Sequence, residues 1–180
     1  LYALAVPNDA AGKMSLPKRL KIFEWGENQS RNKGIYRVGP VTLAVLERNQ
    51  AASGFDRIAL DFVHNTVPGT DAYKDSSEPR PVAAYGVLRV VADDGVYIED
   101  LKWTPEGEAS AANFHDLSPA PITDDDGNVV FVHSVALCRQ GELPGIEFLS
   151  VELNTKQEKT MTLGESITKR LMELNKDRAE

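Results

Sequence analysis

The most constraining feature of the sequence is a predicted β-hairpin over residues 82–103. Its arms, 82-VAAYGVLRVVA-92 and 96-VYIEDLKW-103, are rich in β-branched and aromatic residues. Between them lies Asp94-Gly95, a dipeptide typical of tight hairpin turns. Two long strands joined by so short a turn are antiparallel neighbours in a sheet, and the hairpin therefore predicts a fold built on β-structure.

Further strands are predicted where apolar and polar residues alternate, or where strand-forming residues cluster between turn residues. They are residues 19–25, residues 57–64, a hairpin over 116–138 that turns at 124–128, and residues 146–153. Within 57–64, alternation places His64 on the same face as Ile58, Leu60 and Phe62. The segment 26–34, which contains glycine and asparagine, is predicted as a turn.

Two helices are predicted within this β-rich region. One covers residues 42–54, and the other covers 104–114, with Thr104 as its cap and Pro105 at its first position. Residues 66–81 are rich in proline, serine and charge, which predicts a long surface loop. The fold class expected from these elements is mainly β with flanking helices (α+β), arranged as a barrel or a sandwich.

The C-terminal part of the chain differs in composition. It is polar from residue 156 onward, and residues 163–180 have the pattern of an amphipathic helix. We therefore expect a globular domain over residues 1–155, followed by a linker and a helical tail over 156–180.

Composition restricts the functional class. The net charge of −7 argues against nucleic-acid binding, and no window reaches the roughly 18 apolar residues of a membrane-spanning helix. The single cysteine, Cys138, excludes an internal disulfide and fits a reducing compartment. We expect an intracellular, soluble protein that binds neither nucleic acid nor membrane.

The candidates for chemistry are Ser118 and the three histidines, His64, His115 and His133. His64 ends a predicted strand just before the long loop, a common place for a reactive side chain. Ser118 precedes a proline, which removes a backbone donor and predicts an edge or distorted strand at the hydroxyl. Taken singly, each pattern also fits a structural histidine or a solvated serine.

Metal and thiol chemistry are not indicated. The histidines form no short-spaced pair of the kind that zinc sites use. The segment 124-DDDG-127 lacks the glutamate of a calcium loop, because position twelve is Val135, so an acidic hairpin turn is expected. Cys138 follows an apolar run, where burial makes a thiol inert. No metal and no cofactor are therefore expected.

The order of several segments resembles the prohead proteases of tailed phages, and in particular the Mu-like phage I protein family. The segments are 61-DFVHN-65, a proline-rich loop, 82-VAAYGVLRVVADDGVYIEDLKWTPEG-107, 117-LSPAP-121 and 132-VHSVAL-137. The resemblance covers roughly residues 20–150. These enzymes are similar in plan to herpesvirus assemblin, a serine protease with a closed β-barrel surrounded by helices, and the resemblance implies the same fold here.

The resemblance also implies roles for individual residues. It makes Ser118 the nucleophile and His64 the general base. The segment 139-RQGELPG-145 matches the loop that supplies oxyanion donors in the herpesvirus relatives, with Arg139 or the Gly141 amide in that role.

The third member of the site stays open among four residues. In assemblin it is a second histidine in a His-Val-Ala-Leu-Cys stretch, which 133-HSVALC-138 resembles with one residue inserted. In an unbroken strand the orienting position falls on Ser134, and His133 reaches the site only through a β-bulge. His133 is favoured because an imidazole orients another imidazole better than a hydroxyl does. Asp61 and Asp116 are the remaining two candidates, and Asp61 faces away from His64 in an unbroken strand.

The function implied by the resemblance is a serine endopeptidase that cleaves scaffold protein, capsid protein and itself during prohead maturation. The partners would be the scaffold protein, the major capsid protein and further copies of the chain in a homo-oligomer. The place of action would be the host cytoplasm, inside the assembling prohead. The loop 66–81 is expected to act as a substrate flap, and the second possible function is that of a noncatalytic capsid assembly factor with the same fold.

Overall fold

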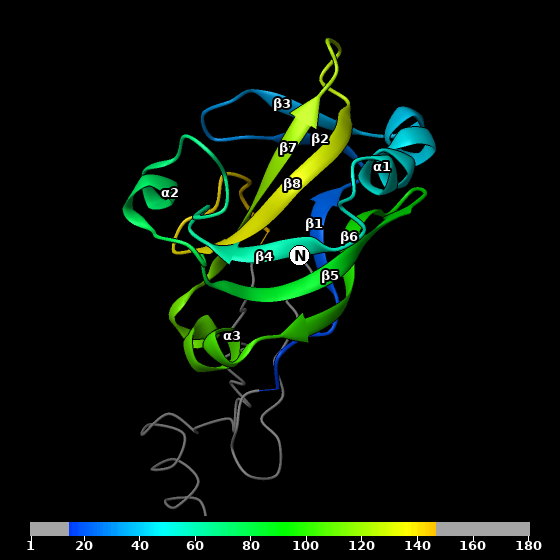
Figure 1. Cartoon of the computed structure of the whole chain (residues 1–180). Helices are drawn as coiled ribbons and strands as arrows, with labels where there is room; N and C mark the ends of the chain where they lie inside the picture. Colours follow the sequence, from blue (N-terminus) through cyan, green and yellow to red (C-terminus); the bar gives the residue numbers. More distant parts are fainter. Residues whose placement is uncertain (1–14, 147–180) are drawn as a thin grey trace, which may run out of the picture.

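The main sheet of the protein, as the computed structural model describes it for residues 15–146, has six strands. They are β1 (Leu20–Glu24), β4 (Ile58–Phe62), β5 (Val82–Val91), β6 (Gly95–Trp103), β7 (Asp116–Thr123) and β8 (Val129–Cys138). Their order across the sheet is β1-β6-β5-β4-β8-β7, and β4 and β8 are the one parallel pair among these strands. The sheet is nearly closed and barrel-like, which confirms the predicted fold class (Figure 1).

A second, two-stranded sheet lies beside the barrel. It consists of β2 (Gly26–Gln29) and β3 (Ile35–Val38), which pair antiparallel. The prediction of a turn over 26–34 was therefore wrong for its first half, because residues 26–29 form a strand. Gly26 and Gly34 both have positive φ angles, +98° and +89°, which an L-residue rarely adopts, and they bend the chain at the start of β2 and before β3.

Three α-helices and one short 3₁₀ helix flank the sheet in the described part of the chain. They are α1 (Pro40–Ala52), α2 (Asp71–Asp75), α3 (Pro105–Ser110) and η1 (Ala111–Asn113). The predicted cap of α3 is confirmed, because the Thr104 hydroxyl accepts a hydrogen bond from the Gly107 amide at 3.0 Å. Between residues 15 and 146 no helix is both long and apolar enough to cross a membrane.

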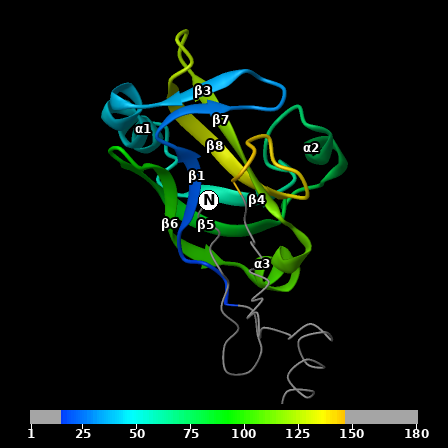
Figure 2. The same ribbon diagram turned by 180° about the vertical axis from the view of Figure 1, so that it is seen from behind.

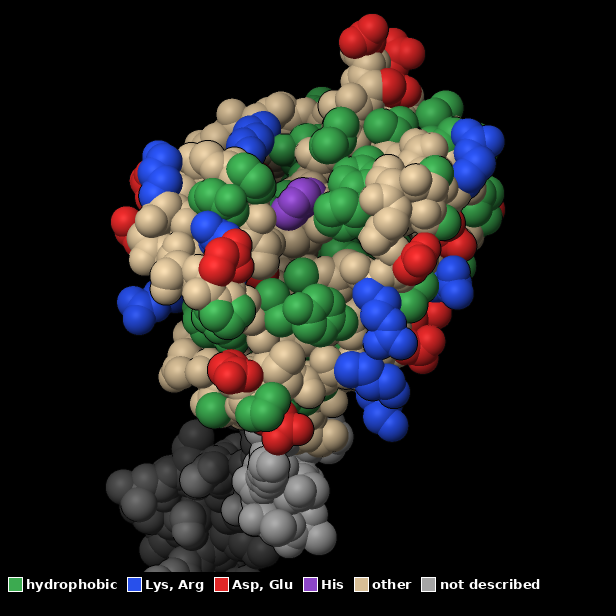
Figure 3. All heavy atoms as spheres, viewed as in Figure 1, with side chains coloured by type: hydrophobic (Ala, Val, Ile, Leu, Met, Phe, Trp, Pro, Cys, Tyr) green, Lys and Arg blue, Asp and Glu red, His purple; other side chains and the backbone are tan. Residues whose placement is uncertain are grey.

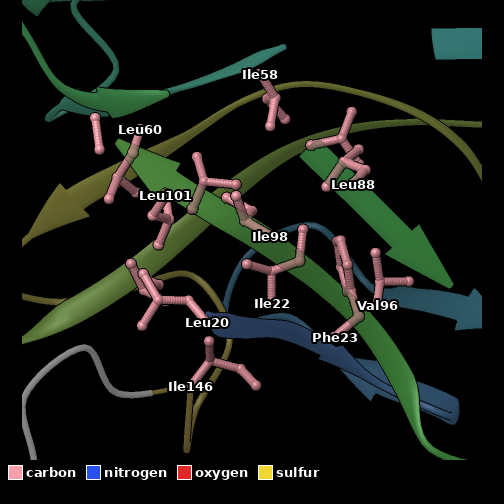
Figure 4. Packing of buried hydrophobic residues seen from close by; sticks show 14 of the residues in the cluster. Leu20, Ile22, Phe23, Ile58, Leu60, Leu88, Val96, Ile98, Leu101 and Ile146 are labelled. Atoms are coloured by element: carbon pink, nitrogen blue, oxygen red, sulfur yellow. The ribbon is translucent and has the colours of Figure 1, made fainter. Parts of the chain in front are cut away.

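The inner face of the sheet forms the hydrophobic core. Fully or almost fully buried side chains from all six strands meet there (Figure 4), among them Leu20, Ile22, Phe23, Ile58, Leu60, Leu88, Val96, Ile98, Leu101, Leu117, Val135 and Leu137. Side chains alternate between the two faces of a strand. The inward set on β4, β7 and β8 therefore leaves alternate residues of these strands on the outer face.

Helix α1 supports β8 where β4 no longer pairs with it. The buried Gln50 side chain donates to the carbonyl of Val132 at 2.9 Å and accepts from its amide at 3.0 Å. Asn49 donates to the Val130 carbonyl at 2.9 Å. Buried backbone groups need such partners, so α1 takes over hydrogen bonds that a neighbouring strand would otherwise make.

Two predicted segments extend past the described residues. The strand expected over 146–153 lies outside them except for Ile146, and the linker and helical tail over 156–180 lie outside them entirely. The division into a domain over 1–155 and a tail stays a prediction.

Candidate functional site

Ser118 and His64 are in hydrogen-bond contact. The Oγ atom of Ser118 lies 3.0 Å from Nε2 of His64, although 54 residues separate them in the chain. Ser118 stands opposite Ala136 in the β7–β8 pair, on the outer face of the sheet. Ser118 is buried, with 7% of its surface exposed. The pairing that the sequence suggested is thus present in the fold.

A tight turn brings His64 to this position. Strand β4 ends at Phe62, and both Val63 and His64 adopt left-handed conformations, with φ angles of +50° and +63°. The turn is fixed by two backbone hydrogen bonds of 3.0 Å, from Val63 to the Leu137 carbonyl and from Asn65 to the Phe62 carbonyl. The prediction that His64 continues the strand was therefore wrong.

The turn carries conformational strain. A left-handed φ is costly for any L-residue and especially for a β-branched one such as Val63. Residues held in this way are found where surrounding structure fixes them, often at functional sites. Here the geometry that strains Val63 also directs the His64 ring toward Ser118.

Replacing Val63 with asparagine is expected to raise the free energy of unfolding by about 0.5–1 kcal/mol, because asparagine tolerates the left-handed region. The side chain is 50% exposed, so little burial is lost. Chemical denaturation measures the change. Val41→Asn is the matched control at an exposed helical valine, and its stability should change by less than about 0.5 kcal/mol. A destabilised Val63→Asn protein would contradict the strain.

The side chain of Asp61 stabilises the turn at His64 through hydrogen bonds. It is fully buried on β4, and its Oδ1 accepts a hydrogen bond from the His64 backbone amide at 3.1 Å. Its Oδ2 accepts from the Thr66 hydroxyl. Asp61 is paired in register with Ala136, the residue opposite Ser118, so its side chain lies on the same face as Ser118. The carboxylate thus bonds to the backbone of His64 and holds the residue in place.

The electrostatic surroundings keep the His64 ring neutral. Burial lowers the pKa of His64 below its ordinary value of 6.5, and it is the largest cause. The charges of Lys33 and His133 lower it further, whereas Asp61 and Glu142 act in the opposite direction. A neutral imidazole at neutral pH is able to accept a proton.

A β-bulge interrupts β8 next to the site. Pro119 pairs with Val135 and Pro121 pairs with Val132, so one residue of β7 stands opposite residues 133–134 of β8. The extra residue changes the alternation of side chains along the strand. The bulge that His133 requires in order to leave the inner face is therefore present.

The four candidates for the third member are placed differently. The His133 ring lies 5.5 Å from the ring of Phe55 and acts on the pKa of His64. Ser134 is fully buried. Asp61 is bonded to the His64 amide, and the Asp116 carboxylate is bonded to His115 and to the Gly141 amide. The buried atoms without a hydrogen-bond partner within residues 15–146 include Nδ1 of His64, Nδ1 of His133 and Oγ of Ser134.

The loop 139–145 borders the site and is held against β7. The Gly141 amide donates to Asp116 Oδ2 at 2.7 Å, so this expected oxyanion donor is already engaged. A β-carbon on Gly141 would lie 2.4 Å from the Leu117 carbonyl oxygen, which restricts the position to glycine. The second expected donor, Arg139, is exposed.

Glu142 joins this loop to the β2–β3 hairpin, a role that no sequence pattern indicates. Its carboxylate accepts hydrogen bonds from the Ser30 hydroxyl and from the Asn32 amide, the latter at 2.8 Å. The bond from Ser30 is the main cause that lowers the pKa of Glu142 below its ordinary value. Figure 2 shows the loop (orange) beside the β2–β3 hairpin. The Glu142 and Asn32 partners are 110 residues apart, so local patterns carry no signal of the contact.

Comparison with known families assigns the chain. The family model described as Mu-like prophage I protein, N-terminal domain, matches residues 20–150. The chain belongs to this family. The match covers the whole six-stranded sheet, with Ser118 and His64, and it associates the protein with a phage or prophage. Among curated proteins and solved structures, none matches significantly.

Two predictions about other groups in this prophage I-protein domain are confirmed. Burial raises the pKa of the Cys138 thiol to about 11, so the thiol is protonated and belongs to the core. Asp124 accepts hydrogen bonds from the amides of Asp126 and Asn128, as expected for an acidic hairpin turn. Among residues 15–146, no three side chains gather in a way that would hold a metal ion.

One face of the molecule has a hollow bordered by hydrophobic side chains (Figure 3). On the face shown in Figure 3, a histidine side chain lies in a hollow with hydrophobic side chains beside it. Loop 66–81, which contains α2, follows His64 directly. Its base is fixed by Asn65, whose side chain donates to the Pro81 carbonyl at 2.8 Å.

Proposed function

We propose that this domain is a serine endopeptidase of a tailed phage or prophage. The observation that carries the proposal is the 3.0 Å contact between Ser118 Oγ and His64 Nε2. A serine hydroxyl is a poor nucleophile until a base takes its proton, and burial keeps His64 in the neutral form that such a base requires. The strained turn at Val63 also supports a catalytic role for the pair, because it directs the His64 ring toward the Ser118 hydroxyl.

The mechanism follows the chemistry of this pair. Ser118 Oγ attacks the carbonyl carbon of the substrate peptide, and Nε2 of His64 takes the hydroxyl proton as the new C–O bond forms. The protonated imidazole then gives that proton to the leaving amine, and the C–N bond breaks. Water releases the acyl group from Ser118 in the same way, with His64 again as the base.

Two groups are proposed to support His64. Asp61 holds the residue through its backbone amide. His133 is the proposed third member, because the bulge in β8 frees its ring from the alternation of the strand. Its role would be to orient the His64 ring from the side of Nδ1, which has no hydrogen-bond partner among the described residues.

The proposed substrates are the scaffold protein, the capsid protein and the chain itself, and the proposed state is a homo-oligomer inside the assembling prohead in the host cytoplasm. These follow from the resemblance to prohead proteases and are supported by the prophage family of the domain. Loop 66–81 is proposed as the flap over the substrate, because it starts next to His64 and its ends are joined by Asn65.

Covalent labelling of Ser118 tests the proposal. A fluorophosphonate probe should react with Ser118 in the folded protein, and tryptic mass spectrometry should locate the adduct there. Labelling should disappear after heat denaturation, since it depends on His64. A folded protein that takes up no label at Ser118 would favour the second possible function, a noncatalytic assembly factor. The engaged Gly141 amide is the observation that favours this second function.

A further inference from the structure

A row of apolar side chains lies on the outer face of β7 and β8, the face that also carries Ser118. Its far end is Ile122, which is 55% exposed. Ile122 is paired in register with Phe131 on β8. Residues directly opposite each other in an antiparallel pair have neighbouring side chains on one face, so Ile122 and Phe131 are adjacent.

Ring contacts continue the row to His133. The Phe131 ring lies 5.2 Å from that of Phe55, which lies 5.5 Å from the ring of His133. His133 in turn is close enough to His64 to lower its pKa. We call Ile122, Phe131 and Phe55 the apolar row.

The apolar row is not required by the core. The inner face of β8 is filled by Val129, Val132 and Val135, whereas Phe131 is only half-buried. Single exposed apolar side chains are ordinary, but contiguous ones mark binding surfaces. Figure 3 shows hydrophobic side chains gathered beside the hollow that contains a histidine.

We propose that the apolar row is a subsite that receives a large apolar side chain of the peptide substrate. The inference rests on the proposed protease function and adds a sequence preference to it. Ile122 is four residues from Ser118 on β7, which at about 3.3 Å per residue is about 13 Å. An extended peptide bound along β7 would therefore place its apolar residue three or four positions from the cleaved bond.

The dimensions of the row favour a peptide over a second protein. A stable protein interface buries about 800 Å² on each partner. The row has one well-exposed side chain and two half-buried rings, which suits one substrate side chain. Its inner end is Phe55, whose ring lies 5.5 Å from that of His133, and Ile122 at its outer end shares a face of β7 with Ser118.

Cleavage of a proteome-derived peptide library, read by mass spectrometry, tests the subsite. The wild-type protein should cleave peptides enriched in a large apolar residue three or four positions from the cut. Ile122→Asp should lower kcat/KM for these peptides by about tenfold or more, mainly through KM. Fluorophosphonate labelling of Ser118 should be unchanged. Leu43→Asp is the matched control, because Leu43 is a similarly exposed leucine (44%) on α1 and should behave as wild type.

The outcomes separate the subsite from the proposed function. Cleavage without apolar enrichment, or enrichment that persists in Ile122→Asp, overturns the subsite while the protease stands. Absence of both cleavage and Ser118 labelling overturns the two together. The wild-type library profile requires no variant, and Ile122→Ser repeats the test without a charge if the aspartate variant does not fold.

Discussion

Replacing Ser118 with alanine is expected to lower kcat/KM by at least about 10⁴-fold and to leave the full-length chain unprocessed. Alanine has no oxygen to form the acyl intermediate, and removal of a nucleophilic serine eliminates nearly all of the catalysis that the group supplies. The fold should persist, because loss of one partly buried hydrogen bond costs about 1 kcal/mol. Peptide-library cleavage and the mass of the purified chain measure the effect.

Ser53→Ala is the control for this variant. Ser53 is an exposed serine at the end of α1 and lies outside the proposed site. Its variant should cleave and self-process like the wild type. Undiminished processing by a folded Ser118→Ala protein would show that Ser118 is not the nucleophile.

The second large effect concerns the pH dependence of kcat/KM. Activity should fall on the acid side with a midpoint below 6.5, because burial lowers the pKa of His64 and the protonated ring accepts no proton. His64→Gln should lower kcat/KM by about 10²–10⁴-fold and remove this acid limb. His115→Gln, at an exposed histidine outside the pair, should keep the limb.

The same pKa shift makes stability depend on pH. In the unfolded chain His64 has its ordinary pKa near 6.5, so on acidification the unfolded state binds the proton first. The free energy of unfolding should fall as the pH drops below about 6.5 and should level off below the folded-state pKa. This contribution should be absent from His64→Gln. An acid limb of kcat/KM centred above 6.5 in the wild type would contradict the proposed state of His64.

The residues that could be predicted from the sequence are those governed by local chemistry. Asp94-Gly95 and the acidic turn at 124–128 mark two hairpins because turn residues act within a few positions. Thr104 marks the start of a helix for the same reason. The Ser118–His64 pair could be predicted from the order of the family's motifs. The distance between the two side chains depends on the closure of the barrel, which no local pattern describes.

The residues that could not be predicted depend on contacts far along the chain. Val63 is a strand-forming residue, so local preference extends β4 through His64, whereas in the fold both residues adopt left-handed conformations while the Val63 amide is bonded to the Leu137 carbonyl of β8. The bulge at 133–134 is defined by the pairing of β7 with β8 and has no signature within β8. The Glu142 contact to the β2–β3 hairpin spans 110 residues.

Through Gln50, helix α1 helps to fix the strand that carries His133. The Gln50 side-chain amide is hydrogen-bonded to both the backbone amide and the carbonyl of Val132, one residue before the bulge. We call this pair of bonds the Gln50 clamp. A one-residue slip of β8 would exchange the faces of His133 and Ser134. The Gln50 clamp, together with the pairing of β8 to β4 and β7, therefore holds the register on which the placement of His133 depends.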